Sequence, residues 1–194
     1  MKRPNRTISF ALSLLLVGMA VRSNAVEELT KEQRIDQFVK LPKAERQKLE
    51  LFAMKQVVED SARRVAAAPD YTKIKLSENE EILRVEYRVK EKMVFETLIV
   101  QKAALLNRSH VAECFPCLGE HGWELSLKFT DDGKKLFGQA TQKAVGHRIA
   151  MVFGCSIVLC APTINEPITG GAATISGGLD EQSARNITLF FEAP

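Results

Sequence analysis

The first 25 residues contain no acidic side chain, although 24 acidic residues occur in the rest of the 194-residue chain. They comprise a basic start (Met1 to Arg6), an apolar run (Phe10 to Val21) and a small-residue end (Ser23 to Ala25). A membrane-spanning helix needs about 20 apolar residues, and this run is shorter and is closed by an arginine. The layout predicts a secretory signal peptide over residues 1–25, and an uncleaved anchor is the alternative.

Without residues 1–25, the chain has no excess of basic over acidic residues. The formal net charge is +3, but residues 1–25 hold four basic residues and no acidic one, so the rest carries −1. Since nucleic-acid-binding proteins present basic surfaces, we expect no nucleic-acid partner. The remaining 169 residues fit one ordinary domain with a small appendage. We expect a periplasmic or secreted protein with no membrane span after signal cleavage.

The usual catalytic motifs are missing as well. No Gly-X-Ser-X-Gly elbow, phosphate loop or His-Glu-X-X-His motif occurs. Asp131 and Asp132 are adjacent, but a position at a helix start, facing the helix dipole, explains them better than an acid/base pair. We therefore expect no enzyme activity, no catalytic residue and no cofactor.

Residues 26–69 predict a helical hairpin or a single kinked helix. Thr30 and Gln33 have the spacing of a capping box, and Pro69 ends the pattern. Between them, apolar residues recur at helical steps: Leu51, Met54, Val58, Ala62 and Val65. Such an arm either packs on its own domain or docks a partner, because an amphipathic face can bury against either.

Residues 70–194 change to an alternating pattern. Strands are predicted at 74–76, 83–89, 94–100, 123–129, 149–153, 157–161 and 172–176, with a short helix after Asn107 and longer helices at 131–145 and from 180. Strands in hairpins with helices at intervals predict an α+β fold, a two-layer sandwich with a mostly antiparallel sheet, preceded by the N-terminal helical arm.

One long stretch resembles a known family. Leu125 to Phe137, then Val145 to Val152, and then Ala161 to Gly178 with a helix from Asp180, are similar to the head subdomain of the first periplasmic domain of SecD in the SecDF protein-export family. The likeness is strong over 125–178 and weaker back to about 82. The resemblance implies a non-catalytic periplasmic module that binds extended polypeptide or an export or envelope partner. Because the chain ends at Pro194, we expect a stand-alone exported protein without the family's membrane motor.

The connection between two predicted strands is the best candidate for such binding, because it is long and rich in proline and glycine and extended chains often add at sheet edges. The candidate residues are Pro162, Ile164, Pro167, Ile168, Gly170 and Gly171. A well-packed loop needed only for the fold is the alternative.

The four cysteines offer other possibilities: Cys114, Cys117, Cys155 and Cys160. An even number in an exported chain favours disulfides. Cys155 and Cys160 would lie ~16 Å apart on a strand, beyond the ~7 Å reach of a bridge, so we expect bridges from the 114/117 pair to the 155/160 pair. Disulfide exchange by Cys114 and Cys117, or a metal site of these two with His121, are alternatives. For the protein as a whole, a structural adaptor that docks through the N-terminal helices is another alternative function.

Overall fold

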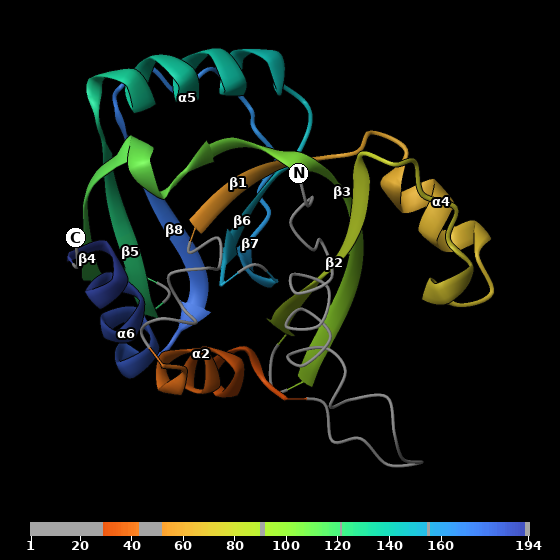
Figure 1. The fold of residues 1–194 in the computed structure, drawn as a ribbon, viewed down its shortest axis with the longest axis horizontal. Helices are drawn as coiled ribbons and strands as arrows, with labels where there is room; N and C mark the ends of the chain where they lie inside the picture. Colours follow the sequence, from red (N-terminus) through yellow and green to blue (C-terminus); the bar gives the residue numbers. More distant parts are fainter. Residues whose placement is uncertain (1–28, 43–51, 90–91, 121, 155, 193–194) are drawn as a thin grey trace, which may run out of the picture.

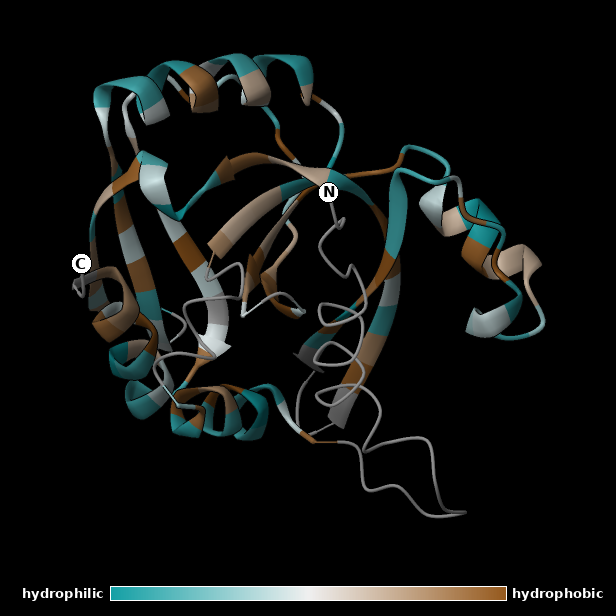
Figure 2. Cartoon of the chain, viewed as in Figure 1, coloured by the Kyte–Doolittle hydropathy of each residue, from teal (hydrophilic) through white to brown (hydrophobic). Residues whose placement is uncertain are grey.

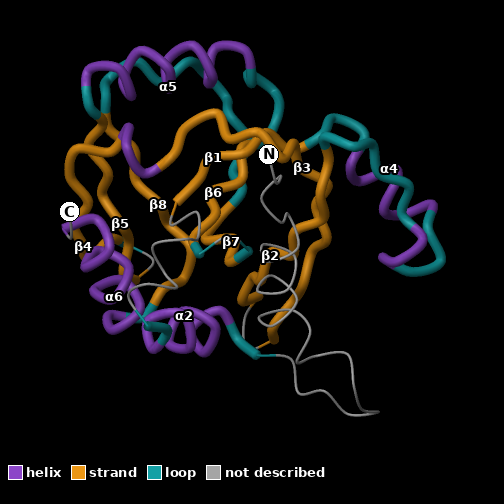
Figure 3. Tube along the Cα trace, viewed as in Figure 1, coloured by secondary structure: helices purple, strands orange, loops and turns teal. Residues whose placement is uncertain are grey.

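The computed structural model describes residues 29–42, 52–89, 92–120, 122–154 and 156–192. Helices lie around the outside of the strands (Figures 1 and 3). The helices are α2 (Lys31–Lys40), α4 (Ser61–Ala67), α5 (Asp131–Lys143) and α6 (Glu181–Glu192), with 3-10 turns η1 (Tyr71–Lys73) and η2 (Arg108–His110). The strands are β1 (Phe52–Val57), β2 (Glu80–Val89), β3 (Lys92–Asn107), β4 (Val111–Gly119), β5 (Gly122–Phe129), β6 (Ile149–Phe153), β7 (Ile157–Cys160) and β8 (Ala172–Leu179).

Five strands close into a barrel in the order β1-β3-β2-β7-β6. All neighbours are antiparallel except β2 and β7, which run parallel and meet at the pair Val85–Val158. The buried side chains of this barrel form a cluster of mostly small or β-branched residues: Val57, Leu83, Val85, Leu98, Val100, Ala150, Val152, Val158 and Ala161.

Two ion pairs connect barrel strands that are not neighbours. Lys55 on β1 lies 2.8 Å from Glu81 on β2, and Lys55 is buried. Arg148, just before β6, lies 2.5 Å from Glu96 on β3. Because each pair skips at least one strand of the barrel order, both hold the closed shape in addition to the backbone ladder.

The other three strands form a separate antiparallel sheet in the order β4-β5-β8. Its inner face carries Leu125, Leu127 and Ile175, which are fully buried, and brown bands alternate with paler ones along β5 in Figure 2. These side chains join Met54, Met151 and other barrel residues in the main hydrophobic core.

Helices α2, α5 and α6 cover this main core. Phe38 on α2 packs edge-on against Phe153 with ring centroids 5.0 Å apart, and lies 5.5 Å from Phe190 on α6. On α5, the ring centroid of Phe137 lies 4.6 Å from that of Phe129 at the end of β5. Within the described part of the chain, no helix combines the length and hydropathy that a membrane crossing requires.

The α+β class and the mostly antiparallel pairing are confirmed, although the strands divide between a barrel and a separate sheet. The capping box is also present: Thr30 Oγ1 accepts from the Gln33 amide at 3.3 Å, and the Gln33 side chain accepts from the Thr30 amide at 2.8 Å. Gly154, with φ of 57°, turns the chain between β6 and β7 in the expected hairpin.

The helix predicted through residues 51–58 is wrong, because residues 52–57 form β1, and between residues 52 and 69 only residues 61–67 form an α-helix. Phe52 and Met54 enter the main core, while Val57 enters the barrel cluster on the other side. A strand buried on both faces has no polar side, so its sequence does not alternate and can match a helical spacing. The strand predicted at 74–76 is also wrong, since that segment follows η1 outside any strand.

Candidate functional site

Cys114 and Cys117 lie in β4, opposite Leu127 and Glu124 of β5. Cys114 is buried and Cys117 half-buried. Residues three apart in a strand point to opposite faces and are separated by ~10 Å, which is beyond the reach of a disulfide. The geometry therefore does not favour disulfide exchange.

The third described cysteine, Cys160, lies at the end of β7 with its Sγ 3.5 Å from the Sδ of Met151. Burial raises the pKa of Cys160 to about 12, so the thiol stays protonated and unreactive. No disulfide joins two of the described cysteines, which are Cys114, Cys117 and Cys160. Cys155 lies outside the described residues, so the bridges expected from it stay a prediction.

Two of the three proposed metal ligands, Cys114 and Cys117, point apart. Among the residues that the structure describes, no group of three or more histidine, cysteine or acidic side chains is arranged to hold an ion. Cys114 and Cys117 point to opposite faces of β4, and His121 and the predicted signal peptide lie outside the described residues. His110 instead has a local role, because its Nδ1 accepts from the Asn107 amide at 3.2 Å.

The 162–171 loop runs along α5. Ile164 is buried and forms a bridge with Val145. The Ile168 amide donates to Thr141 Oγ1 at 2.9 Å, and the Gly171 carbonyl accepts from Phe129 at 2.9 Å.

These contacts agree with the alternative of a packed loop for Ile164, Ile168 and Gly171. The remaining candidates, Pro162, Pro167 and Gly170, are exposed. The loop then leads directly into β8.

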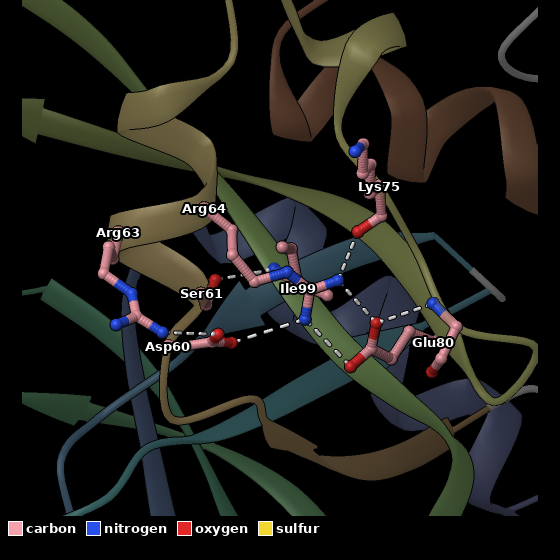
Figure 4. Close-up of polar contacts among 8 residues, drawn as sticks. Asp60, Ser61, Arg63, Arg64, Lys75, Glu80 and Ile99 are labelled. Atoms are coloured by element: carbon pink, nitrogen blue, oxygen red, sulfur yellow. Dashed lines mark hydrogen bonds and ion pairs between the residues drawn. The ribbon is translucent and has the colours of Figure 1, made fainter.

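A polar network surrounds Arg64 on α4 (Figure 4). Its guanidinium donates to both carboxylate oxygens of Glu80, at 3.0 and 2.7 Å, and to Asp60 at 3.3 Å. It also donates to the Lys75 carbonyl, while Glu80 accepts from the Ser77 amide at 2.9 Å. These contacts fasten α4 and the following loop to the start of β2.

A second set of charges is buried beneath α2. Lys31 Nζ donates to the Leu159 carbonyl at 3.4 Å, and desolvation lowers the pKa of Lys31. Arg34 pairs at 3.3 Å with Glu86, whose side chain is only 1% exposed. These contacts hold α2 against β2 and β7, which again is a structural role.

The three-stranded sheet presents unpaired main-chain groups. Pro116 in β4 has no N–H and lies opposite Leu125, so the two residues are not mutually hydrogen-bonded and the main-chain groups of Leu125 point to β8. Leu125 lies opposite Ile175, which is therefore bonded to β5. Its neighbours Thr174 and Ser176 consequently direct their N–H and C=O groups away from the sheet.

The same alternation places the main-chain groups of Ala172 on this outer edge. Among described residues, no backbone hydrogen bond outside the strand ladders involves Ala172, Thr174 or Ser176. All three are exposed, and β8 contains neither a charged residue nor proline, two features that commonly block pairing at natural edges. We call these three residues and their outward main-chain groups the β8 edge.

The opposite edge of the same sheet differs. Pro116 interrupts the row of N–H donors in the middle of β4. Helix α6 also lies along β4, and its Arg185 is 5.5 Å from the ring centroid of Trp123 on β5. Among the described residues, the β8 edge is thus the edge of this sheet with an unbroken row of outward main-chain groups. Sequence reasoning missed it because an edge depends on which strands pair, although Pro116 was a signal that β4 is an edge strand.

Together these features define a small α+β domain in which a mostly antiparallel barrel and an antiparallel sheet share one core. Residues 81–193 match the family model described as SecDF, P1 head subdomain, and the chain belongs to this family. The resemblance drawn from residues 125–178 is therefore confirmed.

Individual relatives agree with this assignment. The chain is 35% identical over 97 residues to the protein translocase subunit SecD of Rickettsia bellii, covering 50% of this chain and 19% of the relative. It is 39% identical over 71 residues to SecD of Acetobacter pasteurianus, covering 37% and 13%. The chain thus matches less than a fifth of the length of these relatives.

A solved structure of SecDF, described as a membrane component that enhances protein export, superposes with a TM-score of 0.50. That match covers 98% of this chain and 89% of the other at 18% identity, and it supports the fold alone.

Proposed function

We propose that this protein is a non-catalytic exported module that binds extended polypeptide by strand addition at the β8 edge. The observation that carries the proposal is the row of outward main-chain groups at Ala172, Thr174 and Ser176 on a strand without charge or proline. Main-chain hydrogen bonds to such an edge supply affinity with little dependence on sequence. Membership of a family of translocase components is consistent with this role.

The first test is a titration of the purified protein with a reduced, carboxymethylated protein that cannot refold, followed by fluorescence anisotropy. The native form of the same protein serves as the control. We expect binding to the unfolded form to be about tenfold tighter or better. Equal binding of both forms would contradict the proposal.

A matched pair of variants then tests the location. Thr174→Pro removes an outward N–H from the β8 edge, and Leu118→Pro removes one from the β4 edge of the same sheet, because Leu118 has the same register as Pro116. Thr174→Pro should lose most of the affinity and Leu118→Pro little of it. Thermal unfolding checks that both are folded. Equal losses in two folded variants would place binding elsewhere.

A further inference from the structure

The β8 edge is short, and a glycine with positive φ lies at each of its ends. We infer that the edge recognises segments five residues long that have free amides at the first, third and fifth positions. This recognition, which rests on the proposed function and names its substrate class, depends on the main chain alone. It requires no particular side chain in the bound segment.

The regular part of β8 contains five residues. Residues 172–176 pair one to one with residues 124–128 of β5. The next pair joins Leu179 to Trp123, so the two residues before Leu179 have no partner of their own on β5. Extra residues on one strand form a bulge, which bends that strand and increases its twist. The regular edge therefore ends at Ser176.

The two glycines limit this regular part at both ends. Gly178 lies in the bulge with a φ of 63°, and a β-carbon placed on it would meet no neighbouring atom. Backbone conformation rather than space therefore requires glycine there. At the other end, Gly171 has a φ of 80°. Since an extended strand has negative φ, neither glycine continues the line of the edge.

The hydrogen-bonding pattern determines which amides of a bound segment matter. Three residues of the regular part direct their main-chain groups outward: Ala172, Thr174 and Ser176. The other pairs of this sheet are antiparallel, and in an antiparallel addition each of the three exchanges two hydrogen bonds with the residue opposite. Those opposite residues are the first, third and fifth of the segment. The amides of the second and fourth residues point away from β8, so a blocked amide is harmless there.

Segment length and amide position should therefore depend on each other. A five-residue segment with blocked amides at its odd positions can shift by one residue, but it then bonds through its second and fourth residues only. A seven-residue segment blocked in the same way still has three free amides, at its second, fourth and sixth residues. It can shift by one residue and fill the whole edge. The penalty for blocking odd positions should thus appear at five residues and disappear at seven.

The experiment uses threonine peptides with acetylated and amidated ends, titrated into the isotope-labelled protein and followed by NMR chemical shifts. Extension from three to five residues should tighten binding about tenfold, because it adds one bonded pair. Extension from five to seven should change affinity by no more than about threefold, since it adds only alternative registers.

N-methylation of the same peptides tests the positions of the bonded amides. At five residues, N-methylation of the odd positions should weaken binding about tenfold relative to N-methylation of the even positions. At seven residues, the two patterns should agree within about twofold. Thr174→Pro should weaken binding of the unmodified five-residue peptide, and Leu118→Pro should not.

The outcomes separate this inference from the proposed function. The inference is overturned and the proposed function stands if affinity rises about tenfold again from five to seven residues. The same holds if odd and even N-methylation have equal effects at five residues, or if no peptide binds while the unfolded protein does. If the unfolded protein binds no better than its native form, the proposed function itself fails.

Discussion

At the scale of single residues, the planar guanidinium of Arg64 holds α4 and the loop that follows it against the start of β2. The guanidinium meets Glu80 with two parallel hydrogen bonds and reaches Asp60 and the Lys75 carbonyl as well. Its side chain is 24% exposed, whereas that of the neighbouring Arg63 is 81% exposed and, within the described residues, pairs with Asp60 alone. We therefore expect Arg64 to contribute more to stability than Arg63, although both lie in the same short helix.

Arg64→Lys should lower the free energy of unfolding by about 1 kcal/mol, because an ammonium keeps the charge but cannot make the paired contact with Glu80. Arg63→Lys is the matched control and should stay within about 0.5 kcal/mol of the wild type. Urea denaturation measures both. A loss of the same size in the two variants would show that the paired geometry contributes nothing.

Glu80 should make stability depend on acid. The hydrogen bond from Arg64 lowers the pKa of Glu80 from 4.5 to about 2. Since the folded-state pKa lies below the unfolded one, this carboxylate stabilises the fold fully above pH 4.5, and its contribution is lost as the pH falls from 4.5 to about 2. Melting temperatures of the wild type and Glu80→Gln should differ at pH 7 and converge across that range. A constant difference down to pH 2 would contradict the assignment.

At the scale of elements, α5 contains two glycines with different surroundings. A methyl group on Gly133 would lie 2.2 Å from the backbone carbonyl oxygen of His110, but one on Gly138 would meet nothing closer than 3.6 Å. Gly133 therefore permits the close approach of the helix to η2. Gly138 has no such reason in the described surroundings.

Gly133→Ala should destabilise the protein by roughly 2 kcal/mol or more, because a backbone atom must move and α5 must shift with it. Gly138→Ala should be neutral or stabilising by up to about 1 kcal/mol, since alanine favours helix over glycine. Thermal and urea unfolding measure the stability of both variants and show whether close packing or helix propensity decides the effect at each position. Destabilisation by Gly138→Ala alone would refute the packing argument.

The elements also show what the sequence could predict. Helices α5 and α6 and strands with one buried face, such as β5, show clear caps or periodicity and were found near their true limits. For α2 the capping box marked the start, but the predicted helical arm continued far beyond Lys40. Strand β1 was mistaken for helix because both of its faces are buried. The β8 edge was missed for a different reason, since neighbour order in a sheet comes from tertiary pairing, which no local pattern records.

At the scale of the whole molecule, the N-terminal segments are integrated with the family domain. Strand β1 pairs with β3 and β6 inside the barrel, and α2 completes the main core through Ile35 and Phe38, both fully buried. The sequence could show that α2 is amphipathic but not what its apolar face contacts. Removal of residues 26–68 should therefore unfold the protein, because it opens the barrel and exposes the core.

Phe38→Ala tests whether α2 stabilises the whole fold. Phe38 contacts Phe153 and Phe190 at 5.0 and 5.5 Å, so its truncation should cost about 3–5 kcal/mol. The only tryptophan, Trp123, lies on β5, so it reports unfolding of the three-stranded sheet and not of α2 alone. Its fluorescence should show a lower urea midpoint in one cooperative transition, while Gln37→Ala, exposed on the same helix, leaves the midpoint unchanged. An unchanged Trp123 transition in Phe38→Ala would mean that α2 is an independent arm.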